Sequence, residues 1–156
     1  MRYLLPAMVV LLPTLAIVDK RDDEREAKMS AMGVEMLRSA RTTPMKPASL
    51  RDFAKAWRAG MATLTKTACA CRDRWTTDPT EKNHCINDAS LDLMRGLMPV
   101  ILRVPGKLEA IEAAEKRSKA EASAATETLV AEMMKKAVPA KEQKAAMSRL
   151  LTCVGN

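Results

Sequence analysis

The sequence predicts an all-α protein, and three observations support this prediction. The 156 residues are rich in Ala, Met, Leu, Lys and Glu and contain only 5 glycines and 3% aromatic residues. Apolar residues recur every three or four positions along several long segments. Ser, Asp and Pro stand where these segments begin or end. We expect an N-terminal membrane-anchor helix, a disulfide-stapled antiparallel helix hairpin and extended C-terminal helices.

Residues 1–18 are expected to form the membrane anchor. Arg2 is followed by an uncharged run from Tyr3 to Val18, and a charged run begins at Asp19. The uncharged run is shorter than the ~20 apolar residues that usually span a bilayer, and it contains two prolines. A secretory signal peptide that is removed from the mature protein is the alternative interpretation, because the run also has the basic start and the length of such a signal.

Residues 19–43 are expected to form a charged amphipathic helix. The segment carries six basic and six acidic residues. Its apolar stripe consists of Met29, Met32, Met36 and Ala40. Pro44 and Pro47 then prevent the helix from continuing.

Residues 48–104 are expected to form the hairpin. Ser49 and Asp52 have the spacing of a capping box at the start of the first helix, and Asp78 and Pro79 suit the start of the second. The apolar stripe of the first helix is Leu50, Phe53, Trp57, Met61, Leu64, Ala68 and Cys71. The stripe of the second is Cys85, Ala89, Leu93, Leu97, Ile101 and Val104. Both stripes have the spacing of helices that pack along their length.

Residues 107–156 are expected to form the extended C-terminal helices. Residues 112–128 are rich in Ala, Lys and Glu, which is typical of an exposed helix. Apolar edges return at residues 129–137 and, after Pro139, at residues 147–153. Since one hairpin cannot cover these edges, we expect partner subunits to cover them.

The four cysteines permit three disulfide pairings. Cys71 and Cys85 lie on the packing stripes of the two hairpin helices, and antiparallel helices ~8–10 Å apart bring such positions within disulfide reach. Cys69 lies about 200° around the helix from Cys71 and faces elsewhere. The favoured pairing is therefore Cys71 with Cys85, which leaves Cys69 to pair with Cys153. Disulfides indicate an oxidising compartment.

A metal site is the alternative role for Cys69, Cys71, His84 and Cys85, which have the ligand types of zinc. Two cysteines separated by one helical residue point apart, and the 12 methionines are spaced like core residues. We therefore expect neither a metal nor a cofactor. His84 is the only histidine, and no nucleophile or carboxylate constellation accompanies it, so we expect a protein that is not an enzyme.

The net charge of +7 is concentrated in residues 46–75, which hold seven basic and two acidic residues. The candidate contact residues are Arg51, Lys55, Arg58, Lys66, Arg72 and Arg74. Such residues can face lipid phosphate or an acidic partner protein, although a solvated helix face is the ordinary interpretation. The segment lacks the interleaved aromatic residues of a nucleic-acid module, so we expect no nucleic-acid partner.

The segment from Cys71 through Arg-Asp-Arg-Trp-Thr-Thr to Cys85 resembles the turn of disulfide-stapled helical hairpins in accessory subunits of mitochondrial respiratory complexes. The nearest case is the hinge-protein family of the cytochrome bc1 complex, which has two cysteines at this spacing around a polar turn. Met61 and Pro99 stand near the places of that family's second cysteine pair. That family is also acidic and has no anchor. The resemblance implies a stapled hairpin that faces the intermembrane space.

These observations together predict a non-catalytic accessory subunit of a mitochondrial inner-membrane complex, in the respiratory chain or ATP synthase. Its partners would be other subunits and membrane lipids, with the soluble part in the intermembrane space. The alternative is a secreted or periplasmic helical binding protein whose signal is cleaved. A metal-handling protein is a third, less favoured possibility.

Overall fold

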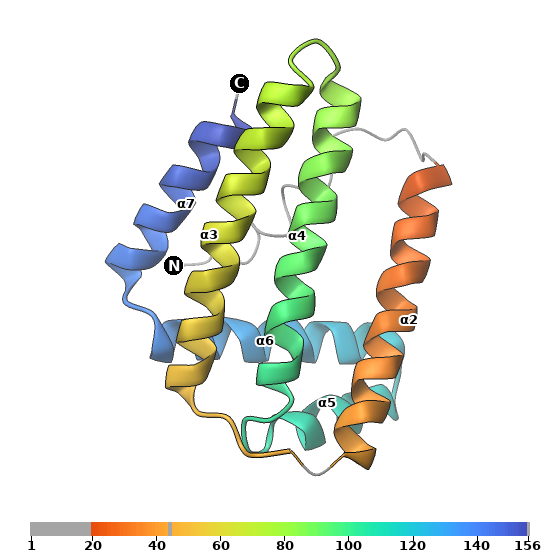
Figure 1. Ribbon diagram of the computed structural model, residues 1–156. Helices are drawn as coiled ribbons and strands as arrows, with labels where there is room; N and C mark the ends of the chain where they lie inside the picture. The colour runs from red at the N-terminus through yellow and green to blue at the C-terminus, as the bar shows by residue number, and fades with distance from the viewer. Residues whose placement is uncertain (1–19, 44, 156) are drawn as a thin grey trace. The chain divides into compact units, whose positions relative to one another are not determined.

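The computed structural model describes residues 20–43 and 45–155 of the chain. Within these residues the structure is entirely helical and contains no strand. The chain divides into two compact units, residues 1–46 and residues 47–156, which are described separately. The helices are α2 (Lys20–Thr42), α3 (Leu50–Arg74), α4 (Pro79–Ile101), α5 (Lys107–Glu115), α6 (Lys119–Ala137) and α7 (Ala140–Val154) (Figure 1).

The first unit contains α2, the expected charged amphipathic helix. Met32, Met36 and Ala40 of the expected stripe are half-buried, and Val34 is 56% exposed. Met29 lies outside the side chains that the structure describes, and the expected anchor at residues 1–18 lies outside the described residues altogether. None of the described helices combines the length and the apolar character that a membrane crossing requires.

The α3–α4 hairpin of the second unit begins and turns where its capping residues predict. The Ser49 backbone N–H donates to Asp52 Oδ2 at 2.7 Å, and Ser49 Oγ accepts from the Asp52 N–H at 3.2 Å, which completes a capping box. α3 ends with the Trp75 N–H donating to the Cys71 carbonyl at 3.0 Å. Asp78 Oδ1 then caps α4 by accepting from the Glu81 N–H at 3.0 Å.

The core of the second unit follows the stripes of this hairpin. Six of the seven stripe residues of α3 are buried, and Leu50, at the first position of the helix, is half-buried. On α4, Ile86 replaces the expected Cys85 at the start of the buried stripe, because Cys85 is only half-buried. Phe53 and Ile101 are fully excluded from solvent. Burial of a large apolar side chain of this kind contributes roughly 1.5–3 kcal/mol to stability.

The prediction of extended C-terminal helices is wrong. α5 and α6 pack against each other, α6 crosses behind the hairpin, and α7 lies along α3 on the side away from α4 (Figure 1). Ser118 starts α6 anew, since its Oγ accepts from the Glu121 N–H at 3.1 Å. Met133 and Leu150, from the two apolar edges assigned to partner subunits, are each only 1% exposed. These parts of the edges are covered by the chain's own helices because α6 and α7 both return to pack on α3, whereas Leu151 of the α7 edge stays 51% exposed.

The corner between α6 and α7 is fixed by Gln143, the one buried polar residue among the described residues. Its Nε2 atom donates to the Val138 carbonyl at 2.8 Å and to the Met134 carbonyl at 3.1 Å. The Val138 carbonyl follows the last residue of α6, where no further helical turn provides a donor, whereas the Met134 carbonyl also accepts from the Val138 N–H at 3.0 Å. Gln143, in the first turn of α7, therefore provides hydrogen-bond donors to the carbonyl groups at the end of α6.

Candidate partner-binding face

Two disulfides tie α3 to both of its neighbours near one end of the unit. Cys71 is bonded to Cys85 of α4, with 5.8 Å between their Cα atoms, and Cys69 is bonded to Cys153 of α7, with 4.5 Å between theirs. These are the two pairs that the sequence favours. Residues two apart on a helix point about 200° from each other. Cys69 and Cys71 can therefore bond to the helices on opposite sides of α3.

The disulfides leave no cysteine thiol for other chemistry. The alternative zinc site would need Cys69, Cys71 and Cys85 as thiolate ligands, and all three are bonded to sulfur instead. His84 is half-buried on α4 beside Cys85. Across residues 20–43 and 45–155, no three His, Cys, Asp or Glu side chains are grouped in a way that could hold a metal ion.

α3 and α7 run parallel in a constant register. Arg58 pairs with Glu142, and Cys69 pairs with Cys153, and each pair is separated by 84 positions in the sequence. Equal separations at two points mean that the helices advance together along their common length. The register holds over eleven residues, from Arg58 to Cys69, which is about 16 Å of helix.

The Arg58–Glu142 pair lies on the surface along this α3–α7 contact. Arg58 Nε donates to Glu142 Oε1 at 2.5 Å, and its Nη2 donates to Oε2 at 3.0 Å, so the contact is bidentate. This hydrogen bonding raises the pKa of Arg58 and holds the pKa of Glu142 below its usual range. The charge of Arg149 lowers the pKa of Glu142 further. The Arg58–Glu142 pair fixes the register of α3 and α7 at the surface, and the Cys69–Cys153 disulfide fixes it nearer the C-terminal ends of the two helices.

The six basic residues singled out in the sequence do not all lie free on one surface. Arg58 is paired with Glu142, and Arg72 contacts Asp73 at 2.8 Å and donates to the Thr152 carbonyl at 3.1 Å. Arg74 lies over the Trp75 ring, 5.1 Å from its centroid. The other three residues are exposed and form no ion pair within the described part of the chain; they are Arg51, Lys55 and Lys66.

α7 supplies a basic residue that the sequence interpretation missed. Arg149 is exposed and lies two turns after Glu142 on the same side of α7, and therefore beside α3. Lys141 lies about 100° around the helix from Glu142 and points away from the buried stripe of α7. α3 carries six Lys or Arg and two Asp, and α7 carries three Lys or Arg and one Glu, so the two helices hold a net charge of +6. The sequence signal was the excess of basic over acidic residues in 140–154, but nothing in the sequence placed that segment beside α3.

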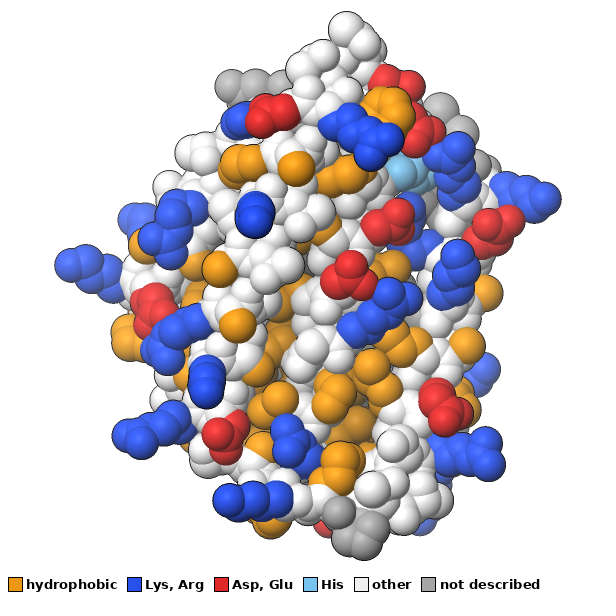
Figure 2. Space-filling view, in the orientation of Figure 1, with side chains coloured by type: hydrophobic (Ala, Val, Ile, Leu, Met, Phe, Trp, Pro, Cys, Tyr) orange, Lys and Arg blue, Asp and Glu red, His pale blue; other side chains and the backbone are white. Residues whose placement is uncertain are grey.

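We call this surface the basic face and define it by Arg51, Lys55 and Lys66 of α3 with Arg149 of α7. Figure 2 shows Lys and Arg side chains gathered over α3 and α7 at the left of the view, with few acidic groups among them. The three carboxylates on these helices are all engaged: Asp52 in the capping box, Asp73 with Arg72, and Glu142 with Arg58. Arg51, Lys55 and Lys66 form no ion pair among the described residues, and Glu142, the carboxylate that interacts with the charge of Arg149, is already paired with Arg58.

A hollow of about 370 Å³ between α5 and α6 is the other candidate site. Three of its lining residues are alanines, and Thr128 and Leu129 also line it, with the Thr128 hydroxyl donating to the Ala124 carbonyl at 2.9 Å. Arg117 and Glu121 lie at this hollow and form an ion pair with each other, so neither is directed at an empty position. The hollow therefore offers no group that would bind or transform a small molecule.

No protein-family model, curated protein or solved structure matches this chain. The resemblance to hinge-protein hairpins thus remains a prediction from residues 71–85. The function is argued below from the stapled helices and the basic face.

Proposed function

We propose that this protein is a non-catalytic binding subunit that works in an oxidising compartment. The observation that carries the proposal is the pair of disulfides that joins α3 to α4 and to α7. Disulfides persist in secreted, periplasmic and intermembrane-space proteins and are rare in reducing compartments. They also consume all four cysteines, which removes the residues that a thiol enzyme or a thiolate metal carrier would need.

The contrast between the buried apolar residues and the unpaired surface cations of the second unit also suits a binding role. The second unit buries Met133 and Leu150 of its apolar edges, although Leu151 is 51% exposed. Arg51, Lys55 and Lys66 of the basic face form no ion pair with the described residues, whereas Arg95, Lys107 and Arg117 elsewhere in the unit do. A rigid scaffold with one unneutralised surface is suited to holding a partner rather than to chemistry.

The more specific form of the proposal is an accessory subunit of a mitochondrial inner-membrane complex, in the respiratory chain or ATP synthase. In this form residues 3–18 remain attached as an anchor, and the disulfide-bonded unit faces the intermembrane space. A secreted or periplasmic binding protein is the alternative, and it differs in that residues 1–18 are a cleaved signal. The support for both forms is the uncharged run followed by Asp19, together with the disulfides.

Peptide mapping of the native protein without reductant tests the compartment. We expect linked peptides that contain Cys71 with Cys85 and Cys69 with Cys153, and no thiol that alkylates before reduction. Native purification tests the binding role, for which we expect an assembly larger than the 17.2 kDa chain. Free thiols in the native protein, or a solitary monomer, would contradict the proposal.

N-terminal sequencing and carbonate extraction separate the two specific forms. A retained Tyr3–Val18 segment that resists carbonate supports the inner-membrane subunit. A mature N-terminus near Asp19, with release into the supernatant, supports the secreted or periplasmic form.

A further inference from the structure

We propose that the basic face binds an acidic helix of a partner protein. This inference rests on the proposed function, and it names the surface and the chemistry of the partner. It depends on where the four cations of this face lie once α7 is placed beside α3, which the sequence alone does not show.

The cations form a linear array along the helix axes. Arg51, Lys55 and Lys66 lie within sixteen residues of α3, and the fifteen steps from Arg51 to Lys66 cover about 22 Å. The shared register with α7 brings Arg149 level with Thr65, since each α7 residue lies beside the α3 residue 84 positions earlier. Arg149 therefore falls beside Lys66, near one end of the array. An array of this length matches four helical turns of a partner.

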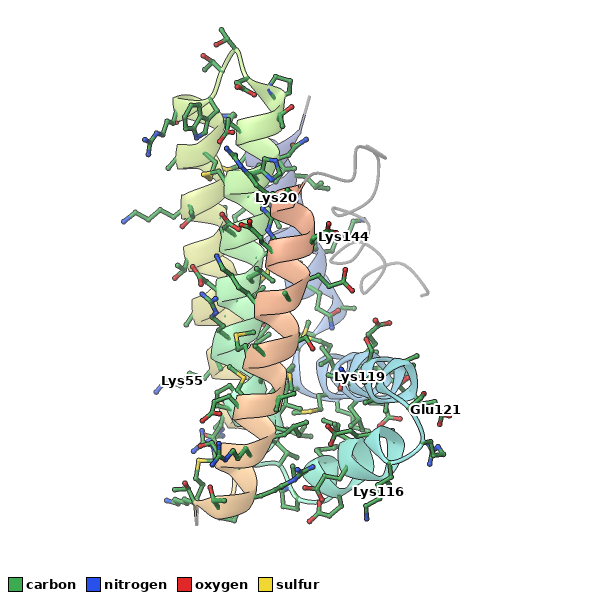
Figure 3. All side chains as sticks on the ribbon, turned by 90° about the vertical axis from the view of Figure 1, so that its right-hand side faces the viewer. Lys20, Lys55, Lys116, Lys119, Glu121 and Lys144 are labelled. Carbon is green, nitrogen blue, oxygen red and sulfur yellow. A yellow bond between two sulfur atoms is a disulfide. The ribbon has the colours of Figure 1, made fainter. Side chains whose placement is uncertain are left out.

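The array carries an excess of positive charge, and it lies on a different side of the unit from α5 and the start of α6. Lys55 projects from α3 on one side of the unit, whereas Lys116, Lys119 and Glu121 lie on the opposite side, at α5 and α6 (Figure 3). That opposite side mixes the two signs, because α5 carries one Lys and three Glu. A carboxylate-bearing partner is thus attracted to the basic face and receives no comparable pull from the side of α5.

The surface between Lys55 and Lys66 carries small side chains. Ala59 follows Lys55 by one turn, Ala62 precedes Lys66 by one turn, and both alanines are exposed. Small side chains there let a partner helix approach closely enough for its carboxylates to reach the cations. The acidic residues would then replace the counter-charges that α3 and α7 lack.

Two other anionic partners fit less well. A lipid surface is held by basic helices that also insert Trp, Phe or Leu, and no exposed apolar residue larger than alanine lies between Arg51 and Lys66. Nucleic acid is scarce where disulfides form, and the basic face offers no aromatic side chain on which a base could stack. Binding of an acidic protein helix requires only cations spaced along the surface and small side chains between them, and α3 provides both.

Binding of the oxidised full-length protein to a synthetic helix tests the proposal. The probe is a peptide of about 20 residues with Glu on one face at helical spacing. A peptide of the same composition with Glu distributed around the helix is its control. We expect the one-sided peptide to bind at least several-fold more tightly than the control, because only it presents carboxylates to the array.

Charge reversal locates the binding surface. The Lys55→Glu/Lys66→Glu variant should lower the affinity for the one-sided peptide by at least about tenfold, mainly through a slower association rate. The matched Lys116→Glu/Lys119→Glu variant makes the same change in net charge on the opposite side and should stay within about twofold of the wild type. If the reversal variant does not fold, Lys55→Gln/Lys66→Gln gives the same comparison with a smaller loss.

Equal losses in the two reversal variants, or equal binding of the two peptides, would overturn the proposal. So would binding to phosphatidylcholine–phosphatidylglycerol vesicles that depends on Lys55 and Lys66 while the peptide does not bind. The native assembly distinguishes this failure from that of the proposed function. If the assembly survives in Lys55→Glu/Lys66→Glu, the protein is a binding subunit whose partner uses another surface, whereas a wild-type monomer removes the binding role itself.

Discussion

At the scale of single residues, Glu142 links the charge of the surface to the register of α7. Its pKa is held below the usual range by Arg58 and by the charge of Arg149. A carboxyl group whose pKa is lower in the folded than in the unfolded protein contributes stability above the unfolded pKa of about 4.3. That contribution is lost as the pH falls through the folded pKa.

We therefore predict that Glu142→Gln destabilises the protein at neutral pH and that the difference from the wild type disappears under strongly acidic conditions. Urea unfolding at a series of pH values measures this difference. Arg58→Gln and the double variant complete a mutant cycle. If Glu142→Gln destabilises equally with and without Arg58, the cation of Arg58 is not the cause of the pH dependence.

Gln143, the next residue, acts through burial instead of charge. Replacing it by leucine keeps the approximate volume and removes the donor of the Val138 carbonyl in the α6–α7 corner. We predict a loss of about 1–3 kcal/mol in the free energy of unfolding, the usual cost of a buried group left without its partner. Lys144→Ala, at the exposed neighbouring position, should change stability by less than about 0.5 kcal/mol. Similar effects of both variants in urea titrations would contradict this role for Gln143.

At the scale of helices, the α3–α4 contact depends on Gly60. A Cβ atom built at Gly60 would collide with Cδ1 of Leu93, a side chain that is 5% exposed, whereas a Cβ atom at Gly96 of α4 would meet nothing within 4 Å. Each Gly→Ala change gains about 1 kcal/mol of helix propensity. Gly60→Ala additionally forces Leu93 to move in a packed core, at a cost of about 1–3 kcal/mol.

We predict that Gly96→Ala stabilises the protein and that Gly60→Ala is less stable than Gly96→Ala by about 1–3 kcal/mol. Thermal and urea unfolding of the two variants make the comparison. Equal stabilisation by both would show that Leu93 relaxes freely and that α3 and α4 do not need the small residue at their contact.

The same helices show what the sequence could predict and what it could not. Ser49, Asp52 and Asp78 act through hydrogen bonds within four residues, so their roles follow from local spacing. The stripes of the hairpin also follow from periodicity, because the turn sets the two helices antiparallel. The break at Ser118 was missed, since its capping bond to Glu121 interrupts a run whose composition favours one continuous helix.

The position of α7 could not be predicted for a different reason. Its neighbour α3 lies 84 residues earlier, and apolar periodicity states that a face is buried without stating against what. For this reason the sequence did not show that Met133 and Leu150 are buried against the chain's own helices, and cover by a partner stays a prediction for Leu151, which is 51% exposed. Within the candidate site, the α3 cations were predicted from the charge excess of residues 46–75, whereas Arg149 joined them only through the fold.

At the scale of the whole molecule, the two disulfides constrain the chain very differently. Cys71–Cys85 closes a loop across one turn, with a sequence separation of 14, and Cys69–Cys153 closes almost the whole second unit, with a separation of 84. In the chain-entropy model, the stabilisation by a disulfide grows with the logarithm of the loop that it closes. The short loop is worth about 3 kcal/mol and the long loop about 4.5 kcal/mol.

We predict that Cys69→Ser/Cys153→Ser destabilises the protein more than Cys71→Ser/Cys85→Ser, by roughly 1–2 kcal/mol in urea unfolding. The two variants are matched, because each replaces one α3 cysteine and its partner by serine. The larger loss follows from the unfolded chain, which gains the freedom of five helices in the first variant and of a single turn in the second. In this variant the register of α7 is held by the Arg58–Glu142 pair and by the hydrogen bond from Arg72 to the Thr152 carbonyl, without the covalent link. If the short-loop variant proves the less stable of the two, native packing at the α3–α4 turn, and not chain entropy, dominates what these disulfides contribute.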